Sequence, residues 1–501
     1  MNVLVVNVQG SGTPCIETGL EIAQNHVDTG DNVVFLHCSA ELLACENNRI
    51  HDMPRCIECI ARRNTGLSCI APSIKAQSFL KLTAADQNEM ARLKTRFSSL
   101  EELRRYTLEN FDIGMGVLSS LISYTRHPTP DLTINADLVQ RLTISAYAVF
   151  RSIQNYLDAY DVNKVYVFNG RTANPRGVIR ACQSRGVSYS VCEMGHSIHH
   201  YGLWDNTTPH SLEYTQNAIR ERWKAATQDP NREILGSEFF QDRAKGCPKE
   251  WESFVSGQTH GLLPPDWNNK KCNIVIFTSS EDEFAAAGDE WQNKLYENQL
   301  DGLRRISQSL CGQGDKLHIY LRMHPNSSSM PDNYNQQFLH LASEFLTVID
   351  PTNPVSTYTL MRAADKVVTF GSTTGIEAVF WGTSSILAGT AFYGGLGGTY
   401  NPKSHKELID LLLARLPPKT REAALMYGYY FSSYGIPYRH YKPTDFGEGE
   451  FKDRNILRSH RWITRMVYYG RRTKLSTYFL NPPFGWFTKK RLFGKRSWQV
   501  T

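Results

Sequence analysis

The sequence predicts an α/β fold with two doubly wound, Rossmann-like domains, and three observations support this prediction. Short apolar runs rich in β-branched residues are bounded by turn residues, which is typical of buried parallel strands. Segments of helical length separate the runs, so parallel pairing through right-handed crossovers is expected. The runs form two blocks on either side of an irregular stretch near 228–270, so we expect two domains that face a cleft.

Each element follows from its apolar pattern. In the first block we expect strands at 2–8, 32–38, 164–170 and 188–193, and helices at 13–27 and 175–186. The polar, periodic stretch 75–160 predicts a helical insertion. In the second block we expect strands at 272–280, 317–326, 345–350, 366–372 and 384–389. The predicted domains are a first α/β domain with the helical insertion (1–250), a second α/β domain (251–420), and C-terminal helices with a tail (421–501), and the motifs below lead us to expect the acceptor on the first domain and the nucleotide on the second.

Composition limits the class of protein. Of 501 residues, 41% are hydrophobic and 21% are charged, which is an ordinary globular balance. No run of 18 apolar residues occurs, so no membrane-spanning helix is expected. The first residues are interpreted as a strand and not as a signal peptide. Eleven cysteines in a chain of this size favour a reducing cytoplasm over a disulfide framework.

The last 47 residues differ in charge from the rest of the chain. From Asn455 to Thr501 there are eleven Lys or Arg and no Asp or Glu, so the preceding residues carry a net charge of about −5. This tail is also rich in aromatic residues, a combination that suits an anionic membrane surface. Packing of the tail on the protein body and binding of nucleic acid are the alternatives, and we expect no nucleic-acid partner.

Two motifs at strand ends of the second block predict an anion site. Arg322 and His324 are two positions apart at the end of one strand, so they point to the same side and can hold a phosphate. In the turn that follows KVVTF, Ser372 and Thr373 precede a helix start, where unpaired N–H groups attract anions. Glu377 lies one turn into that helix, and its carboxylate can accept hydrogen bonds from ribose hydroxyls. Ordinary helix capping is the alternative.

Carboxylates at other strand ends are candidate general bases. Glu193 ends the strand SYSVCE and is the first candidate, and Asp282 and Glu283 after the first strand of the second block are the reserve. His196 and the glycines Gly10 and Gly12 are candidate contacts on the acceptor side.

A cysteine cluster lies near residues 38–69. The spacing of Cys45, Cys56, Cys59 and Cys69 fits a structural zinc site with a single C-x-x-C element. Buried free thiols are the alternative.

The segment RMHPN, followed by VSTYTLMRAADKVVTFGSTTGIEAVFWGTSSIL, resembles the bacterial capsule polysaccharide biosynthesis proteins, which have GT-B-like glycosyltransferase folds. The resemblance covers roughly 270–400. It implies a nucleotide-sugar donor whose phosphates contact His324, Ser372 and Thr373, with Arg322 and Glu377 assisting. It also implies that catalysis requires no metal ion.

We therefore expect a cytoplasmic glycosyltransferase at the inner face of the plasma membrane. Its acceptor would be a growing surface polysaccharide or a lipid-linked glycan of capsule or O-antigen biosynthesis. A polyol-phosphate transferase with a CDP-activated donor, a nucleotide-sugar epimerase and a non-catalytic biosynthesis or export accessory protein are the alternatives.

Overall fold

The computed structural model describes residues 1–456 except 10–13, 247–254, 256, 331 and 446–447. The predicted basic aromatic tail, from 457 onward, therefore lies outside the described residues. The chain divides into two compact units. Within the described residues, unit 1 holds residues 1–125, 129–209 and 435–456, and unit 2 holds 126–128 and 210–434.

Unit 1 is built on a seven-stranded sheet in the order β12-β6-β5-β4-β1-β2-β3. The strands from β5 to β3 are parallel, and β6 and β12 are antiparallel to their neighbours. The strands of this sheet are β1 (Asn2–Asn7), β2 (Asn32–His37), β3 (Lys75–Ser78), β4 (Lys164–Phe168), β5 (Ser188–Met194), β6 (His200–Asp205) and β12 (Ile436–Pro437). A separate antiparallel sheet contains β13 (Tyr441–Asp445), β14 (Glu448–Phe451) and β15 (Arg454–Asn455).

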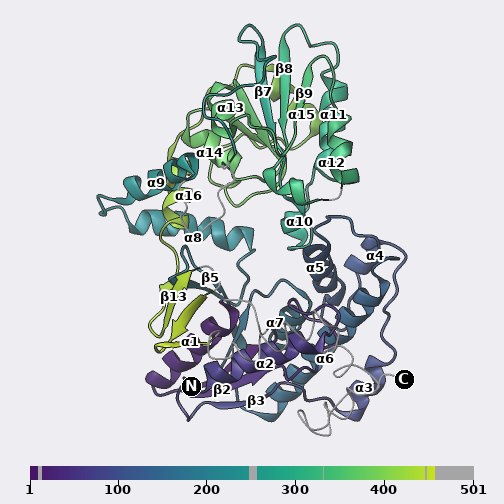
Figure 1. Cartoon of the computed structure of the whole chain (residues 1–501), viewed down its shortest axis with the longest axis vertical. Helices are drawn as coiled ribbons and strands as arrows, with labels where there is room; N and C mark the ends of the chain where they lie inside the picture. Colours follow the sequence, from purple (N-terminus) through teal and green to yellow (C-terminus); the bar gives the residue numbers. More distant parts are fainter. Residues whose placement is uncertain (10–13, 247–254, 256, 331, 446–447, 457–501) are drawn as a thin grey trace. The chain divides into compact units, whose positions relative to one another are not determined.

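Helices connect the parallel strands of unit 1 (Figure 1). They are α1 (Cys15–Asp28), α2 (Met53–Leu67), α3 (Ala84–Met90), α4 (Leu100–Arg104), α5 (Ile113–Thr125), α6 (Ala136–Ala159) and α7 (Ala173–Ser184). Val3 and Val5 of β1 pack with Ile16 and Leu20 of α1 in one buried cluster, as expected for a strand whose face is covered by its crossover helix.

Unit 2 contains a five-stranded, fully parallel sheet in the order β11-β10-β7-β8-β9. Its strands are β7 (Cys272–Phe277), β8 (Leu317–Arg322), β9 (Leu346–Ile349), β10 (Lys366–Thr369) and β11 (Ser384–Leu387). The α-helices are α8 (Leu212–Ala225), α9 (Arg232–Lys245), α10 (Glu281–Phe284), α11 (Gln299–Ser309), α12 (Asp332–Leu339), α13 (Thr357–Ala363), α14 (Thr374–Phe380), α15 (His405–Leu413) and α16 (Glu422–Phe431). Two short 3₁₀ turns are η1 (Asp289–Trp291) and η2 (Pro325–Ser329).

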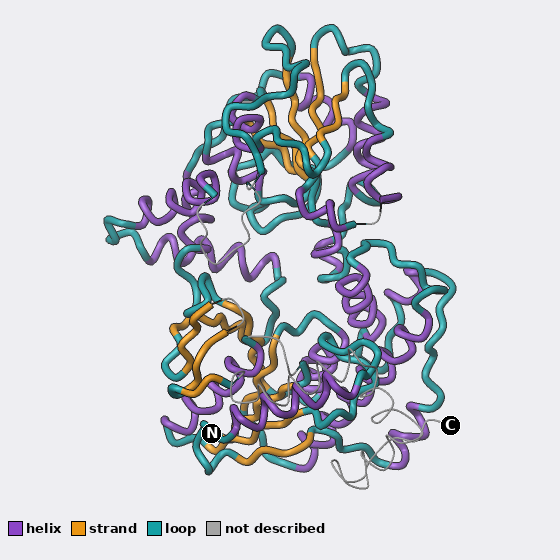
Figure 2. Tube along the Cα trace, viewed as in Figure 1, coloured by secondary structure: helices purple, strands orange, loops and turns teal. Residues whose placement is uncertain are grey.

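Helices flank the unit 2 sheet (Figure 2), and both of its faces carry buried clusters of hydrophobic side chains. Ile274 and Ile276 of β7 pack on the face covered by α11 and α15, whereas Val275 and Phe277 pack on the face covered by α13. Alternate side chains of a strand point to opposite faces, so a strand covered on both sides has a continuous apolar sequence.

The two Rossmann-like domains predicted from the sequence are confirmed, and every predicted strand occurs with ends that differ by a few residues. The insertion 75–160 is mainly helical, although β3 begins it. The prediction of an irregular linker is wrong for α9, which is a helix of unit 2. This helix packs so closely on α16 that a Cβ at Gly236 would lie 2.6 Å from the carbonyl oxygen of Leu425.

The units exchange the chain at positions that differ from the predicted domain boundaries at 250 and 420. The chain enters unit 2 at His210 and returns to unit 1 at Gly435, where β12 pairs with β6. Where C-terminal helices are predicted, α16 occurs in unit 2 and short strands of unit 1 follow it.

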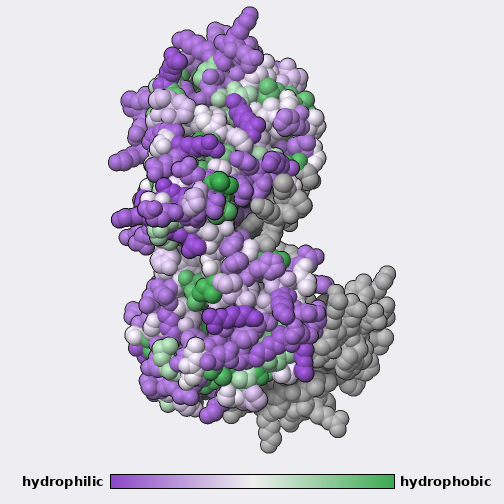
Figure 3. Space-filling model, turned by 90° about the vertical axis from the view of Figure 1, so that its left-hand side faces the viewer, coloured by the Kyte–Doolittle hydropathy of each residue, from purple (hydrophilic) through white to green (hydrophobic). Residues whose placement is uncertain are grey.

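The face seen in Figure 3 is mostly hydrophilic and carries its hydrophobic residues as separate small spots. Large exposed hydrophobic side chains such as Ile50 and Ile134 occur singly along the described chain. Among the described residues, no helix is both long enough and apolar enough to cross a bilayer.

We expect Gly114→Ala to lower the free energy of unfolding by at least about 1–3 kcal/mol. A Cβ at Gly114, on α5, would lie 1.7 Å from the carbonyl oxygen of Leu103, on α4. Urea denaturation followed by circular dichroism measures the change. Gly19→Ala in α1 is the control, because its Cβ would meet Phe35 at an ordinary 3.4 Å and alanine favours a helix by about 1 kcal/mol. Equal stability of Gly114→Ala and the wild type would contradict the packing of α4 on α5.

Candidate functional site

The strand order of unit 2 places its topological switch point between β7 and β10. The chain runs outward from β7 through β8 to β9, and then returns to β10 and β11 on the other side. Ligands of such sheets bind beyond the carboxyl ends of the strands at this point. Phe277 pairs with both Thr369 and Arg322, so the loops after β7, β8 and β10 begin at the same edge.

The loops after β7 and β10 approach each other closely. A Cβ at Gly371 would lie 3.7 Å from the hydroxyl of Ser279 and 2.9 Å from the carbonyl oxygen of Thr390. The absence of a Cβ at Gly371 therefore allows the turn after β10 to lie against the carbonyl oxygen of Thr390, in the chain after β11, whereas Ser279 is at an ordinary contact distance.

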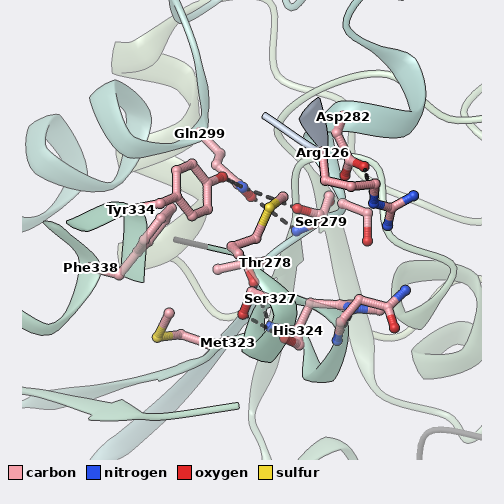
Figure 4. A pocket seen from close by; sticks show the side chains of 13 residues that line it. Arg126, Thr278, Ser279, Asp282, Gln299, Met323, His324, Ser327, Tyr334 and Phe338 are labelled. Carbon is pink, nitrogen blue, oxygen red and sulfur yellow. Dashed lines mark hydrogen bonds and ion pairs between the residues drawn. The ribbon is translucent and has the colours of Figure 1, made fainter. Parts of the chain in front are cut away.

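A pocket with an empty volume of about 340 Å³, partly open to solvent, lies at this edge (Figure 4). Its lining includes Thr278, Ser279 and Asp282 from the chain after β7, and His324 and Ser327 from the chain after β8.

One side chain holds the loop after β7 in place. The Gln299 side-chain oxygen accepts from the Ser279 amide at 2.9 Å, and its Nε2 donates to the Ser279 carbonyl at 3.0 Å. Both residues are buried. The Ser279 hydroxyl is buried in the pocket wall and has no hydrogen-bond partner among the described residues. Such a group costs about 1–3 kcal/mol when it stays unsatisfied, so it is a candidate ligand contact.

His324 is held as a neutral imidazole. Its amide donates to the Thr278 hydroxyl at 2.8 Å, and its Nδ1 accepts from the amide of Asn326 at 3.1 Å. The proton of the neutral ring is therefore on Nε2, which can donate to an anionic oxygen. Burial lowers the pKa of His324 to about 4, and the nearby guanidinium groups of Arg243 and Arg322 add to this shift. The surroundings of the ring are thus electropositive.

The Arg322 guanidinium is used inside the fold. The residue is 2% exposed, and its two terminal nitrogens donate to the carbonyls of Asp350 at 2.7 Å and Asn353 at 3.0 Å. Arg322 therefore orders the loop after β9 and contributes positive charge beside His324. We do not assign it the direct phosphate contact expected from the sequence.

Glu377 is also engaged by neighbouring side chains. Its carboxylate accepts from the hydroxyls of Tyr358 at 2.6 Å and Thr373 at 3.0 Å, and it lies 3.6 Å from the Arg243 guanidinium. With an exposed fraction of 2%, it ties the start of α14 to α13 and α9. The predicted ribose contact by Glu377 is not supported by this burial.

The turn after β10 keeps its predicted position. The Ser372 hydroxyl accepts from the Thr374 amide at 3.3 Å, and its carbonyl accepts from Tyr393 at 2.6 Å. Ser372 and Thr373 are half-buried. The helix that follows, α14, has only seven residues, so its dipole adds little to anion binding at this turn.

Three consecutive acidic residues after β7 have different environments. Asp282 is buried, and its Oδ2 lies 3.1 Å from Nε of Arg126, whereas Glu283 is exposed. Glu281 was not among the candidate bases predicted from the sequence. Its Oε1 accepts a hydrogen bond from the backbone amide of Gln299 at 2.7 Å. Burial raises the pKa of Glu281 to about 7.

In unit 1, Glu193 lies at the carboxyl end of β5. Its Oε2 accepts from the side-chain amide of Asn169 at 2.8 Å, at the end of β4. Burial raises the pKa of Glu193, and the hydrogen bonds from Asn169 and Met194 oppose the rise. The environment is that of a candidate general base.

The other predicted acceptor-side contacts have mixed outcomes. The ring of His196, in the connection from β5 to β6, lies 4.1 Å, centroid to centroid, from the ring of His200, the first residue of β6. Gly10 and Gly12 lie outside the described residues.

The structure changes the membership of the cysteine cluster. Cys45, Cys56 and Cys59 line one pocket together with Cys38, and Cys69 is not among its lining residues. Cys69 follows the end of α2, where its thiol lies 3.2 Å from the carbonyl oxygen of Thr65. Among the described residues, no three His, Cys, Asp or Glu side chains stand in metal-binding positions as they are.

Residues that sequence reasoning missed are supplied by distant elements. Arg243 belongs to α9, whose sequence is polar and was predicted to be irregular. Gln299 and Tyr358 lie in the first turns of α11 and α13, and no sequence motif marks either residue. Ser279 is in a Ser/Thr-rich strand end, TSS, which is the one signal that points to it.

Comparison with known proteins supports the resemblance read from the sequence. Residues 293–441 match the family model described as capsule polysaccharide biosynthesis protein. Recognition of this family is thereby confirmed for that segment, which includes His324, Arg322 and the turn after β10. No curated protein matches the chain.

Several solved structures are similar to the chain at low identity. The KpsC beta Kdo 2,4 transferase of Thermosulfurimonas dismutans has 15% identity and a TM-score of 0.35, over 60% of this chain and 87% of that one. The beta Kdo 2,7 transferase of the same KpsC has 16% identity and a TM-score of 0.34, over 64% and 89%. A putative UDP-N-acetylglucosamine 2-epimerase from Listeria monocytogenes has 12% identity and a TM-score of 0.27, over 88% and 93%.

We expect His324 to make stability depend on pH. The unfolded histidine has a pKa near 6.5 and the folded one near 4, so the unfolded state binds the proton first as the pH falls. Stability is therefore lost between about pH 6.5 and pH 4, by up to about 3 kcal/mol for this group. Urea unfolding of wild type and His324→Gln at pH 7 and pH 5 measures the effect, and the wild type should lose more. Equal losses in the two proteins would contradict the buried neutral imidazole.

Proposed function

We propose that the protein is a glycosyltransferase of capsule polysaccharide or O-antigen biosynthesis that uses a nucleotide-sugar donor. The supporting observation is the unit 2 pocket beyond the carboxyl ends of β7 and β8, whose lining includes the Ser279 hydroxyl, which has no hydrogen-bond partner among the described residues, and the neutral imidazole of His324. Both are donors that suit phosphate oxygens. The match of residues 293–441 to the capsule biosynthesis family supports the same class of reaction.

In this proposal the donor diphosphate binds beside Ser279 and His324, with Ser372 and Thr373 at the neighbouring turn. Arg243 and Arg322 contribute positive charge near His324 without a required contact. Fixed donors and positive charges stabilise the nucleotide as it leaves, so catalysis needs no metal ion.

The acceptor is a growing polysaccharide or a lipid-linked glycan, and we propose that unit 1 binds it. Glu193 takes the proton of the attacking hydroxyl while the bond from that oxygen to the sugar forms and the bond from the sugar to phosphate breaks. The raised pKa of Glu193 supports this role, because a general base works best near the ambient pH.

We further propose that the enzyme is cytoplasmic and docks on the inner face of the plasma membrane. Support comes from charge, because residues 455–501 hold eleven Lys or Arg and no acidic residue.

A thermal-shift panel with CMP, CDP, UDP, GDP and ADP at millimolar concentration tests the donor site. We expect one nucleotide to stand out, because a ligand at 100 times its Kd adds about 2.7 kcal/mol of stability. Ser279→Ala should leave the unliganded protein equally stable or slightly more stable, since it removes an unsatisfied group, and should weaken nucleotide binding about tenfold.

Ser385→Ala is the matched control for Ser279→Ala. Ser385 lies on β11 in the same sheet and also has a buried hydroxyl without a partner among the described residues. The Ser385→Ala protein should bind nucleotide as the wild type does. If no nucleotide stabilises the protein, or if both variants bind normally, the donor site is not at this pocket.

We expect Glu193→Gln to lower sugar transfer about 100-fold or more, because the amide cannot accept the proton. Nucleotide binding should be unchanged, since Glu193 belongs to unit 1. Turnover and the nucleotide thermal shift are measured on the same preparation, with Asp282→Asn in parallel. Normal turnover of Glu193→Gln together with an inactive Asp282→Asn would move the base to unit 2.

A further inference from the structure

Four cysteines of unit 1, far from the unit 2 pocket in sequence, line one pocket with an empty volume of about 390 Å³ that is partly open to solvent. Cys38 directly follows β2, and Cys45 lies in the loop from β2 to α2. Cys56 and Cys59 are three residues apart on α2, so they share one face of that helix. All four are free thiols.

Cys38 is the common neighbour of the other three. A Cys38 thiolate would raise the pKa of the Cys45, Cys56 and Cys59 thiols, because each of them lies within electrostatic range of Cys38. Thiols from three separate places in the sequence thus converge on one point. Cys69 cannot join them, because it lies thirteen residues beyond Cys56 along and past α2, on the order of 15–20 Å at 1.5 Å per residue.

The surroundings supply hydrogen bonds to sulfur. The Asn48 side-chain amide donates to the Cys56 sulfur at 3.2 Å. Backbone N–H groups of Ala40, Glu41 and Leu42 point to the Cys38 sulfur, and their hydrogen bonds oppose the rise in its pKa that burial causes. A neutral thiol is a weak acceptor, whereas a metal-bound thiolate is a strong one.

The turn that aims these amides is strained. Ala40 has φ 65°, in the left-handed region that non-glycine residues seldom adopt. Such strain costs on the order of 1–3 kcal/mol and persists where the surroundings impose it.

Positive charge is present to balance thiolates. The Arg63 guanidinium interacts electrostatically with Cys59 and Cys38 and also donates to the Cys38 carbonyl. Arg55 is a further lining residue of the pocket. A zinc ion with four thiolates has a formal charge of about −2, which two arginines would offset.

We propose that Cys38, Cys45, Cys56 and Cys59 bind one zinc ion as a closed, structural tetrathiolate site. On binding, each thiol gives its proton to solvent and forms one Zn–S bond of about 2.3 Å, so about four protons are released for each ion. In the described residues the four thiols do not stand in ligand positions, so zinc binding requires them to move toward the ion.

The zinc would fasten the loop from β2 to α2 to the carboxyl edge of the unit 1 sheet. This loop contacts that edge through Asn47, whose side-chain amide donates to the carbonyl of Gln9 after β1. It also contacts α7, because the Asn174 amide donates to the Ala44 carbonyl at 3.1 Å. The site is structural and independent of the proposed transferase activity.

Metal analysis of the purified full-length protein tests the proposal. We expect about one zinc per chain by inductively coupled plasma mass spectrometry, released by a mercurial reagent that titrates thiols. Cys38→Ser should lose most of the zinc, and Cys69→Ser should retain it. Retention by Cys38→Ser, or equal loss in both variants, would overturn the assignment of ligands.

Cobalt substitution of the wild type keeps the test valid if Cys38→Ser folds poorly. Intense tetrahedral d–d bands with thiolate charge-transfer absorption are expected at about one cobalt per chain. Failure to bind zinc or cobalt would overturn the proposal, as would iron with acid-labile sulfide or a disulfide between any two of the four cysteines.

Discussion

The parallel pairing of β7 with β8, together with the Gln299 side chain, determines the geometry of the candidate site. The pairing brings the ends of two strands that are about 45 residues apart in sequence to one level. Gln299 then satisfies both backbone groups of Ser279, so the loop after β7 has one conformation. The backbone amide of Gln299 in turn donates to the Glu281 carboxylate, and this bond links that loop to the start of α11. The positions of the Ser279 hydroxyl and of the pocket wall follow from these few bonds.

A second set of buried charged side chains also supports this geometry. Arg322 holds the loop after β9, and Glu377 joins α14 to Tyr358 and Arg243. Buried ions of this kind are retained only when they are paired, and these pairs involve three separate helices and a strand. The result is an electropositive neighbourhood in which His324 remains uncharged and offers a proton on Nε2. The proposed ligand contacts and the structural contacts thus use adjacent residues of the same motifs.

The fold was largely predictable, because short β-branched runs such as NVLVVN and CNIVIF are buried on both faces and have no polar alternation. The site was predictable only to the level of strand ends. A charged residue such as Arg322 has the same local sequence whether it meets a ligand or a carbonyl 28 residues away. That Cys38 and not Cys69 lines the pocket with Cys45, Cys56 and Cys59 follows from the position of the residue after β2, which the local sequence does not contain. The helix α9 likewise depends on its close fit to α16.

The return of the chain to unit 1 has a consequence for biosynthesis. The edge strand β12 pairs with β6 only after the intervening 210–434 have been made, so the last pairing of this sheet closes a loop of more than 200 residues. Until then β6 is an unprotected edge on the ribosome-bound chain, and such edges recruit foreign strands. The edge of this sheet is therefore completed only after unit 2 has been made, and premature termination anywhere within 210–434 leaves β6 as an open edge for chaperones and proteases to recognise.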